Sequence, residues 1–266
     1  MKSSGRSEDF WFELFALIII IIVVQTAYAT IVRPQAHEIR AADIARMKSD
    51  PLFVPVLSPW VVISEPEPET CVIFAFWAFT IIGRKAVRLS RNRKLLETDV
   101  LHLADGMKIL PEDTREYARQ VEALPAEARW QLLPRALTAA LHRFAATRNI
   151  QDVSDAARAV CETESDRLDS ELAMVRFVAW SIPAIGFVGT VRGIGASLQQ
   201  AHRAVEGDVS GVVAGLGVSF NSTLVALSLS ILVMFMLHQI QLRQERLVLD
   251  IEEYLDERVV RHMVVR

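Results

Sequence analysis

Four long apolar stretches constrain this chain more than any other feature of its sequence. They cover residues 10–32, 71–83, 175–198 and 209–237 and are separated by polar segments. A helix needs roughly 20 residues to cross the hydrocarbon of a bilayer, and three of the four stretches reach that length. Apolar residues make up 52% of the chain and are concentrated in these stretches. The pattern predicts an all-α integral membrane protein.

The first stretch, residues 10–32, carries one charge, at Glu13. Its segment Ala27-Tyr28-Ala29 has the small residues of a signal-cleavage site. A cleaved signal has a shorter apolar core, however, so we expect this helix to be retained in the membrane.

The second stretch, residues 71–83, is short, but the sequence before it is suited to begin a helix. Ser64 can cap a helix, the prolines at 66 and 68 fit a first turn, and the acids at 65, 67 and 69 suit its positive end. The helix therefore begins near Pro66 and passes Gly83. A short buried core helix is the alternative; we favour a span, because the chain must return to its first side.

The distribution of lysine and arginine predicts the orientation, because cytoplasmic loops carry an excess of both. Six of them lie between Arg84 and Lys94. We therefore expect both termini in the cytoplasm. The predicted parts are an N-terminus at 1–9, transmembrane helices at 10–32, 66–85, 173–199 and 209–238, outer loops at 33–65 and 200–208, a cytoplasmic helical region at 86–172 and a cytoplasmic C-terminal helix at 239–266.

Residues 86–172 lack the alternation of a strand and are rich in helix-forming Ala, Leu, Glu and Arg. Helices are expected to begin after Pro111 and Pro125, and a third to be capped by Asp152 or Ser154. This third helix meets no proline before Pro183 and so continues into the third span. The fourth span also continues outward, so the last two helices extend into a cytoplasmic helical bundle.

The sequence does not indicate the nucleic-acid, metal or catalytic sites that are typical of soluble proteins. Its net charge of −3 gives no basic field for nucleic acid. Cys71 and Cys161 are too few and too far apart for a zinc site, and the histidines lack metal-ligand spacing. No phosphate-binding loop or nucleophile elbow occurs. We expect neither an enzyme nor a bound cofactor or metal.

The third span holds a proline, three spaced glycines and one threonine. Pro183 frees the carbonyl of Ala179, and Gly186, Gly189 and Gly193 share one side of the helix, where another backbone can approach. At about 100° per residue, Thr190 lies within about 20° of Pro183 around the helix. Arg192 points the opposite way, near the outer end, where it can reach the interface or a partner.

The fourth span carries small residues at steps of three or four, with a polar group at its middle. The small residues are Gly211, Gly215, Ser219, Ser222 or Thr223, Ala226 and Ser230, and Asn221 adds an amide. Such a row allows tight packing or a narrow polar path. Packing alone explains most of these glycines and serines. We expect Pro183, Thr190, Ser219, Asn221, Ser222 and Thr223 to line an ion path.

Neither of these two spans contains Asp or Glu at membrane depth, and Asp208 lies at the outer edge. A proton relay normally needs a titratable group within the membrane. If ions cross here, we expect a second polypeptide to supply the carboxylate.

The segment from Pro183 to Gly193, written P-x-x-G-x-x-G-T-V-x-G, resembles the signature of the MotA/TolQ/ExbB proton channel family. Residues 211–230 resemble the family's last pore-lining helix. Thr190 and Pro183 match the family's threonine and proline on the penultimate helix. Its threonine on the last helix aligns with Ser219, Phe220, Ser222 or Thr223, and Arg192 stands where an apolar or aromatic residue is usual.

The resemblance implies a multi-pass protein of the bacterial inner membrane whose outer loops are periplasmic. It implies a homopentamer around two copies of a single-span partner of the MotB, ExbD or TolR type, which carries a membrane aspartate. Proton or sodium flow through this stator-type channel would do mechanical work on an envelope load. The alternative is a non-conducting oligomeric scaffold of the same fold, suggested by Arg192 and the unmatched threonine. A self-sufficient transporter is disfavoured, because no broken-helix repeat occurs.

Overall fold

A computed structural model describes residues 4–49, 58–98, 100–101, 107–205, 207 and 209–265, with only the backbone of residues 4–9, 47 and 48. Parts of the predicted segments lie outside this description, namely residues 1–3, 50–57, 99, 102–106, 206, 208 and 266. The described residues form helices and no β-strand. They divide into two compact units: Met1–Ile82 with Met174–Leu237, and Gly83–Ala173 with His238–Arg266.

Four helices are long and apolar enough to cross a membrane, as the sequence predicts. They are Phe10–Arg46, Pro66–Leu96, Ile150–Gln199 and Ser210–His262. The shorter elements of the first unit are α3 (Pro59–Ile63) and α10 (Ala201–Val205). The chain is therefore a multi-pass membrane protein with four candidate spans.

The first of these helices is longer than the predicted span. α1 (Ser4–Ala27) passes through a π-helical turn, Tyr28–Val32, into α2 (Arg33–Ser49). The backbone N–H of Arg33 donates to the carbonyl of Tyr28, five residues back. The sequence predicts a loop from residue 33, whereas the structure continues as helix for another 17 residues.

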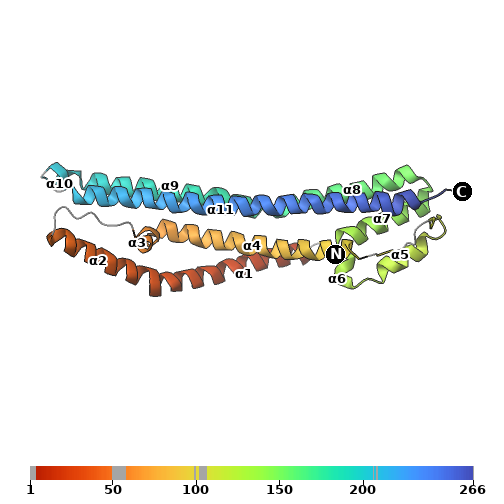
Figure 1. The fold of residues 1–266 in the computed structure, drawn as a ribbon, viewed down its shortest axis with the longest axis horizontal. Helices are drawn as coiled ribbons and strands as arrows, with labels where there is room; N and C mark the ends of the chain where they lie inside the picture. The colour runs from red at the N-terminus through yellow and green to blue at the C-terminus, as the bar shows by residue number, and fades with distance from the viewer. Residues whose placement is uncertain are drawn as a thin grey trace. The chain divides into compact units, whose positions relative to one another are not determined.

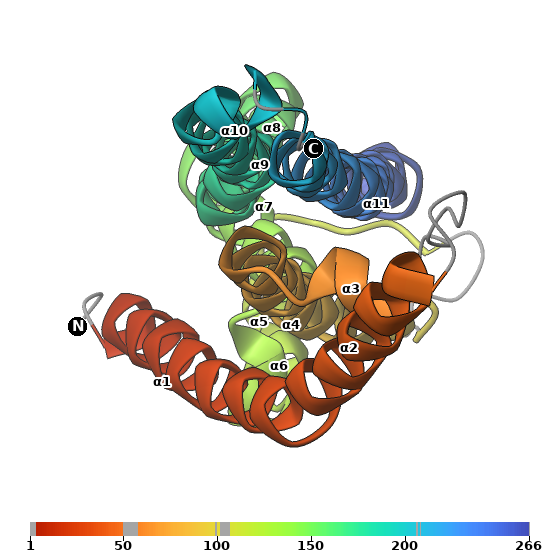
Figure 2. The same cartoon turned by 90° about the vertical axis from the view of Figure 1, so that its left-hand side faces the viewer.

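Within the first unit, α4 (Pro66–Leu96) lies between α1 and a pair of helices, α9 and α11 (Figures 1 and 2). Trp77 on α4 donates its indole N–H to the carbonyl of Glu13 on α1, at 2.9 Å. An apolar cluster of Val24, Tyr28, Val32 and Ile73 joins the first helix to α4. α4 therefore connects the N-terminal helices to the α9–α11 pair.

α9 (Ala173–Gln199) and α11 (Ser210–Tyr254) run side by side. α9 follows α8 (Ile150–Glu171) after a turn of one residue, Leu172. α11 passes without a break from the first unit into the second. Both extensions agree with the sequence-based prediction.

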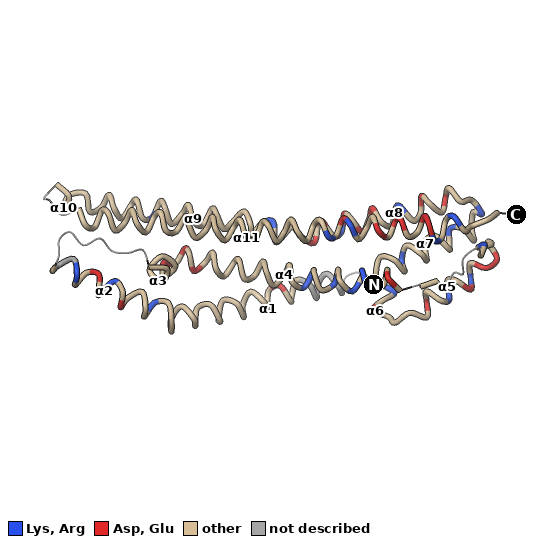
Figure 3. The backbone as a smooth tube through the Cα atoms, in the orientation of Figure 1, with Lys and Arg blue, Asp and Glu red and all other residues tan. Residues whose placement is uncertain are grey.

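The second unit is helical and rich in charge. Its remaining elements are α5 (Thr114–Glu122), α6 (Ala126–Arg129), α7 (Leu132–Thr147), a π-helical turn at Leu255–Val259 and a short 3-10 turn at Val260–His262. Charged residues lie along α8 and along the last part of α11, whereas the middle of α11 carries none (Figure 3). The side chains of α7 that face its core are buried, among them Leu137, Leu141 and Phe144.

Ion pairs hold the helices of the second unit together. The buried Lys85 on α4 contacts Glu171 at the end of α8, with 2.5 Å between Nζ and Oε2. Arg135 on α7 lies 2.5 Å from Glu164 on α8.

The N-cap of α8 is Asn149, whose Oδ1 accepts the N–H of Gln151 at 3.0 Å. The helix thus begins before Asp152 and Ser154, the predicted caps, which lie within it.

Candidate functional site

Five glycines mark the surfaces along which α9 and α11 approach each other. A Cβ added to Gly186 would meet Ala226, one on Gly189 would meet Ser222 at 2.6 Å, and one on Gly193 would meet Ser219. From α11, Gly215 lies against Ser197 and Gly211 against Gln200. By contrast, Gly195 and Gly217 face open space. The close approach is therefore confined to one side of each helix.

Pro183 lies inside α9 without ending it. A proline leaves the carbonyl four residues earlier without its helical donor, and here that carbonyl belongs to Ala179. Ser230 on α11 donates its hydroxyl to the Ala179 oxygen at 3.1 Å. The acceptor that the proline frees is thus bound by the last serine of the small-residue row.

Thr190 and Thr223 meet between the two helices. Their hydroxyl oxygens are in direct contact. The Thr190 hydroxyl lies 3.2 Å from the carbonyl of Gly186 and 3.4 Å from that of Ser219. The Thr223 hydroxyl lies 3.3 and 3.4 Å from the same two carbonyls. Two hydroxyls and two backbone oxygens therefore form one compact polar group, and both threonines are half-buried.

The other predicted path residues of α11 lie in different surroundings. Ser219 and Ser222 are 0% exposed and pack against the glycines of α9. The Ser219 hydroxyl donates to the carbonyl of Gly215 at 3.0 Å, whereas no described group partners the Ser222 hydroxyl. Asn221 lies about 160° around the helix from Thr223 and is not brought to the threonine pair.

Arg192 has partners that the sequence did not suggest. Its guanidinium binds Glu67 in the first turn of α4 and Glu65 just before it. The sequence held one signal for this pairing: a base near the end of the third predicted span and acids at the start of the second, which the predicted topology puts on the same side of the membrane. Charges at the same membrane depth can neutralise each other.

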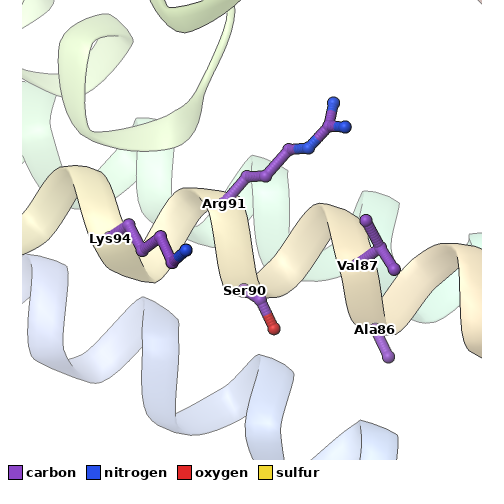
Figure 4. Close-up of a pocket in the computed structure, with 5 residues that line it drawn as sticks. All are labelled: Ala86, Val87, Ser90, Arg91 and Lys94. Carbon is purple, nitrogen blue, oxygen red and sulfur yellow. The ribbon is translucent and has the colours of Figure 1, made fainter.

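A groove in the second unit offers no comparable chemistry. Ala86, Val87, Ser90, Arg91 and Lys94, all from α4, line it. Figure 4 shows that Arg91 and Ser90 point to different sides of the helix, so the groove follows the outside of one element. Two cations and no carboxylate line it, which does not suit a cation path.

The described residues contain no candidate metal site. No group of three or more His, Cys, Asp or Glu among them could hold a metal ion. Cys161 is buried, and burial, with a smaller effect of Glu252, raises its pKa to about 11. This thiol is therefore mainly protonated near neutral pH.

Comparison with known proteins finds one family model that matches part of the chain. The model of the MotA/TolQ/ExbB proton channel family matches residues 129–253, just under half of the chain. No curated protein and no solved structure matches the chain significantly. The matched segment contains the whole of α9, all but the last residue of α11, and hence the threonine pair and every glycine described above. Over residues 129–253, the chain is therefore similar to the MotA/TolQ/ExbB proton channel family, the family that its sequence motif resembles.

Proposed function

We propose that this chain is the channel-forming subunit of a stator-type complex in the bacterial inner membrane. With a single-span partner that carries a membrane aspartate, it couples proton or sodium flow to mechanical work on a load in the envelope. The observation that carries the proposal is the contact of Thr190 with Thr223 inside the segment that the family model matches.

The geometry of the pair suits a cation that has lost its water. In a low-dielectric interior a cation needs polar ligands in place of its hydration shell. Two hydroxyls share two carbonyls here, although they have only two protons to donate. Lone pairs therefore remain, and the donors can exchange without movement of the backbone.

In this proposal the serines and the threonines have different roles. Thr190 and Thr223 face the ion path, whereas Ser219 and Ser222 let the helices approach. Pro183 acts through the bond of Ser230 to Ala179, which joins α9 to α11. Because α9 contains no Asp or Glu, and α11 none before Glu245, the partner's aspartate is the titratable group on the path.

Two contacts support conduction over a non-conducting scaffold. Thr223 contacts Thr190, so we take it as the counterpart of the family's threonine on the last helix. Arg192 is bound by Glu67 and Glu65. Conduction is therefore the function that we favour.

The test is ion flux in vesicles that contain the chain and its partner, which we expect to co-purify as a single-span, aspartate-bearing protein. Thr190→Val and Thr223→Val should each reduce flux by about tenfold or more, because valine keeps the shape and removes a polar ligand. Thr190→Ser should retain flux.

Thr80→Val on α4 is the matched control. Its hydroxyl donates only to Phe76 of its own helix, at 2.9 Å, so flux should be unchanged. Undiminished flux in both Thr190→Val and Thr223→Val would contradict the site. Flux driven by a proton gradient in sodium-free buffer would identify the ion as the proton.

A further inference from the structure

The first turn of α4 is bound to α9 by a bidentate ion pair. Arg192 Nε lies 2.7 Å from Glu67 Oε1, and its Nη2 lies 2.8 Å from Glu67 Oε2. The same Nη2 lies 3.0 Å from Oε2 of Glu65. Only 11% of the Glu67 side chain is exposed. A planar guanidinium and a carboxylate with two parallel bonds form a strong and directional contact.

Two further pairs complete a balanced network around this contact. Arg40 of α2 lies 2.7 Å from Oε1 of Glu65, and Arg33 lies 2.9 Å from Oε2 of Glu69. Three carboxylates thus face three guanidinium groups. The acids also stand at the positive end of the α4 macrodipole, which favours their charge.

The pair reaches the α9–α11 contact through Glu67. Arg192 follows Thr190 by two residues and leaves α9 on the opposite side of the helix. The Cγ of Glu67 is 3.2 Å from the point that a Cβ on Gly189 would occupy, and Ser222 Oγ is 2.9 Å from that point. Three helices therefore meet at Gly189, and the Glu67 side chain reaches the contact of α9 with α11.

This position gives the pair an electrostatic consequence. A lone arginine two residues from Thr190 would repel a cation, and a lone buried carboxylate would attract one. Because the charges are bound to each other, their fields largely cancel at distances greater than the separation of the two charges. The charge of Arg192 is neutralised by a residue of another helix.

We propose that Glu67 and Arg192 are a charge-compensated pair that sets the electrostatic potential at the outer end of the ion path. Glu67 is the specificity-determining residue: it cancels the repulsion that Arg192 would exert on a cation. The effect on ion flow rests on the proposed function, but the potential itself is measurable without ion flow.

The experiment places a cysteine beside the pair and measures its reaction with charged thiol reagents. Gly195 faces open space and lies three residues after Arg192, on the same side of α9, so Gly195→Cys is accommodated. Its rates with a cationic trimethylammonium methanethiosulfonate and with an anionic sulfonate analogue give a ratio that reports the local potential. The protein with Gly195 retained measures any reaction of the buried Cys71 and Cys161.

The two single variants should change this ratio in opposite directions. In Glu67→Gln the cation-to-anion ratio should fall about three- to tenfold, and in Arg192→Gln it should rise by a similar factor. The double variant should return to the parent value. Arg192→Lys retains the charge and loses the bidentate contact, so its ratio should remain near the parent's. Arg33→Gln, which breaks the separate ion pair of Arg33 with Glu69, is the control and should have little effect.

A purely structural role predicts a different result, because both single variants break the same contact. Ratios that move in the same direction, or do not move, would overturn the proposal. Should Glu67→Gln fail to fold, the thiol-reaction ratios of Arg192→Gln and Arg192→Lys are compared instead. The proposal then requires the ratio to rise in Arg192→Gln and to remain near the parent's in Arg192→Lys. In the flux assay, Glu67→Gln should reduce cation flux and the double variant should restore it. Absence of flux in the parent would count against the proposed function and leave the thiol ratios as a separate result.

Discussion

At the scale of single residues, the α9–α11 contact separates two kinds of hydroxyl. Thr190 and Thr223 bind each other and two shared carbonyls at a half-buried position. Ser219 and Ser222 are fully buried against glycines. A hydroxyl that lies inside a helix contact has little access to a passing ion, so only the threonines are suited to a path.

Ser222→Ala tests this division. The Ser222 hydroxyl is buried without a partner, and an unsatisfied buried hydroxyl costs about 1–3 kcal/mol. Alanine removes the group with almost no change in shape. We expect the thermal midpoint in detergent to be unchanged or raised, and ion flux to be retained. Ser219→Ala, which loses a bond to Gly215, is the comparison, and loss of flux in Ser222→Ala would return this serine to the path.

Residue roles could be predicted from the sequence only where a motif fixes the position. Thr190 and Pro183 have fixed positions in the P-x-x-G-x-x-G-T-V-x-G motif. Thr223 could not be separated from Ser219 and Ser222, because all lie within about one turn and the choice depends on the partner helix. The pairing of Glu67 with Arg192 joins residues 125 positions apart, which periodicity does not reveal.

At the scale of elements, the packing of α9 on α11 depends on which glycines face the partner helix. Gly189→Ala would place a Cβ 2.6 Å from the Cβ of Ser222. Such overpacking costs about 1–3 kcal/mol, so we expect the thermal midpoint to fall by about 2–10 °C. Gly195→Ala, with nothing within 4 Å, should leave the midpoint unchanged or raise it slightly, since alanine favours helix.

These two variants share a helix and a chemical change, so they differ only in the face that carries the methyl group. Thermal unfolding followed by circular dichroism measures both. An equal fall of the midpoint in the two variants would show that general destabilisation, and not the α11 contact, explains the effect.

The boundaries of elements could be predicted where the composition changes sharply. They could not be predicted where a helix continues past a proline through a local change of its hydrogen bonding. A loop was expected from residue 33, because the apolar stretch ends at Val32 and a segment of mixed charge follows. Pro34 would also interrupt a regular helix by clashing with the carbonyl four residues earlier. The structure accommodates Pro34 after a π-helical turn, in which Arg33 bonds to Tyr28. A wider turn relieves this kind of conflict, but no residue pattern announced it.

At the scale of the whole molecule, the segment that the family model matches, residues 129–253, includes parts of both compact units. It includes α7, α8, α9 and nearly all of α11. α11 is one uninterrupted helix of 45 residues that contributes to each unit. The match therefore does not coincide with either compact unit.

The incomplete ion path predicts how the chain assembles. Large apolar side chains are exposed along α9 and α11, among them Phe187, Val191, Phe220 and Leu224, and neither helix supplies a carboxylate beside the threonine pair. The family resemblance implies five copies of this chain with two of the partner, and we expect native mass spectrometry of the purified complex to give this composition. Lipid alone could cover the apolar surfaces, but it could not supply the acid.

Neutralising the partner's aspartate separates assembly from conduction. The Asp→Asn variant should leave the mass of the complex unchanged, because the amide keeps the size of the carboxyl group. It should abolish flux, because an amide cannot bind and release a proton in this range of pH. Thr190→Val should show the same combination of intact assembly and lost flux. Flux that persisted without the carboxylate would mean that the path uses an acid of this chain, and Glu67, the buried acid packed against Gly189, would be the first to substitute.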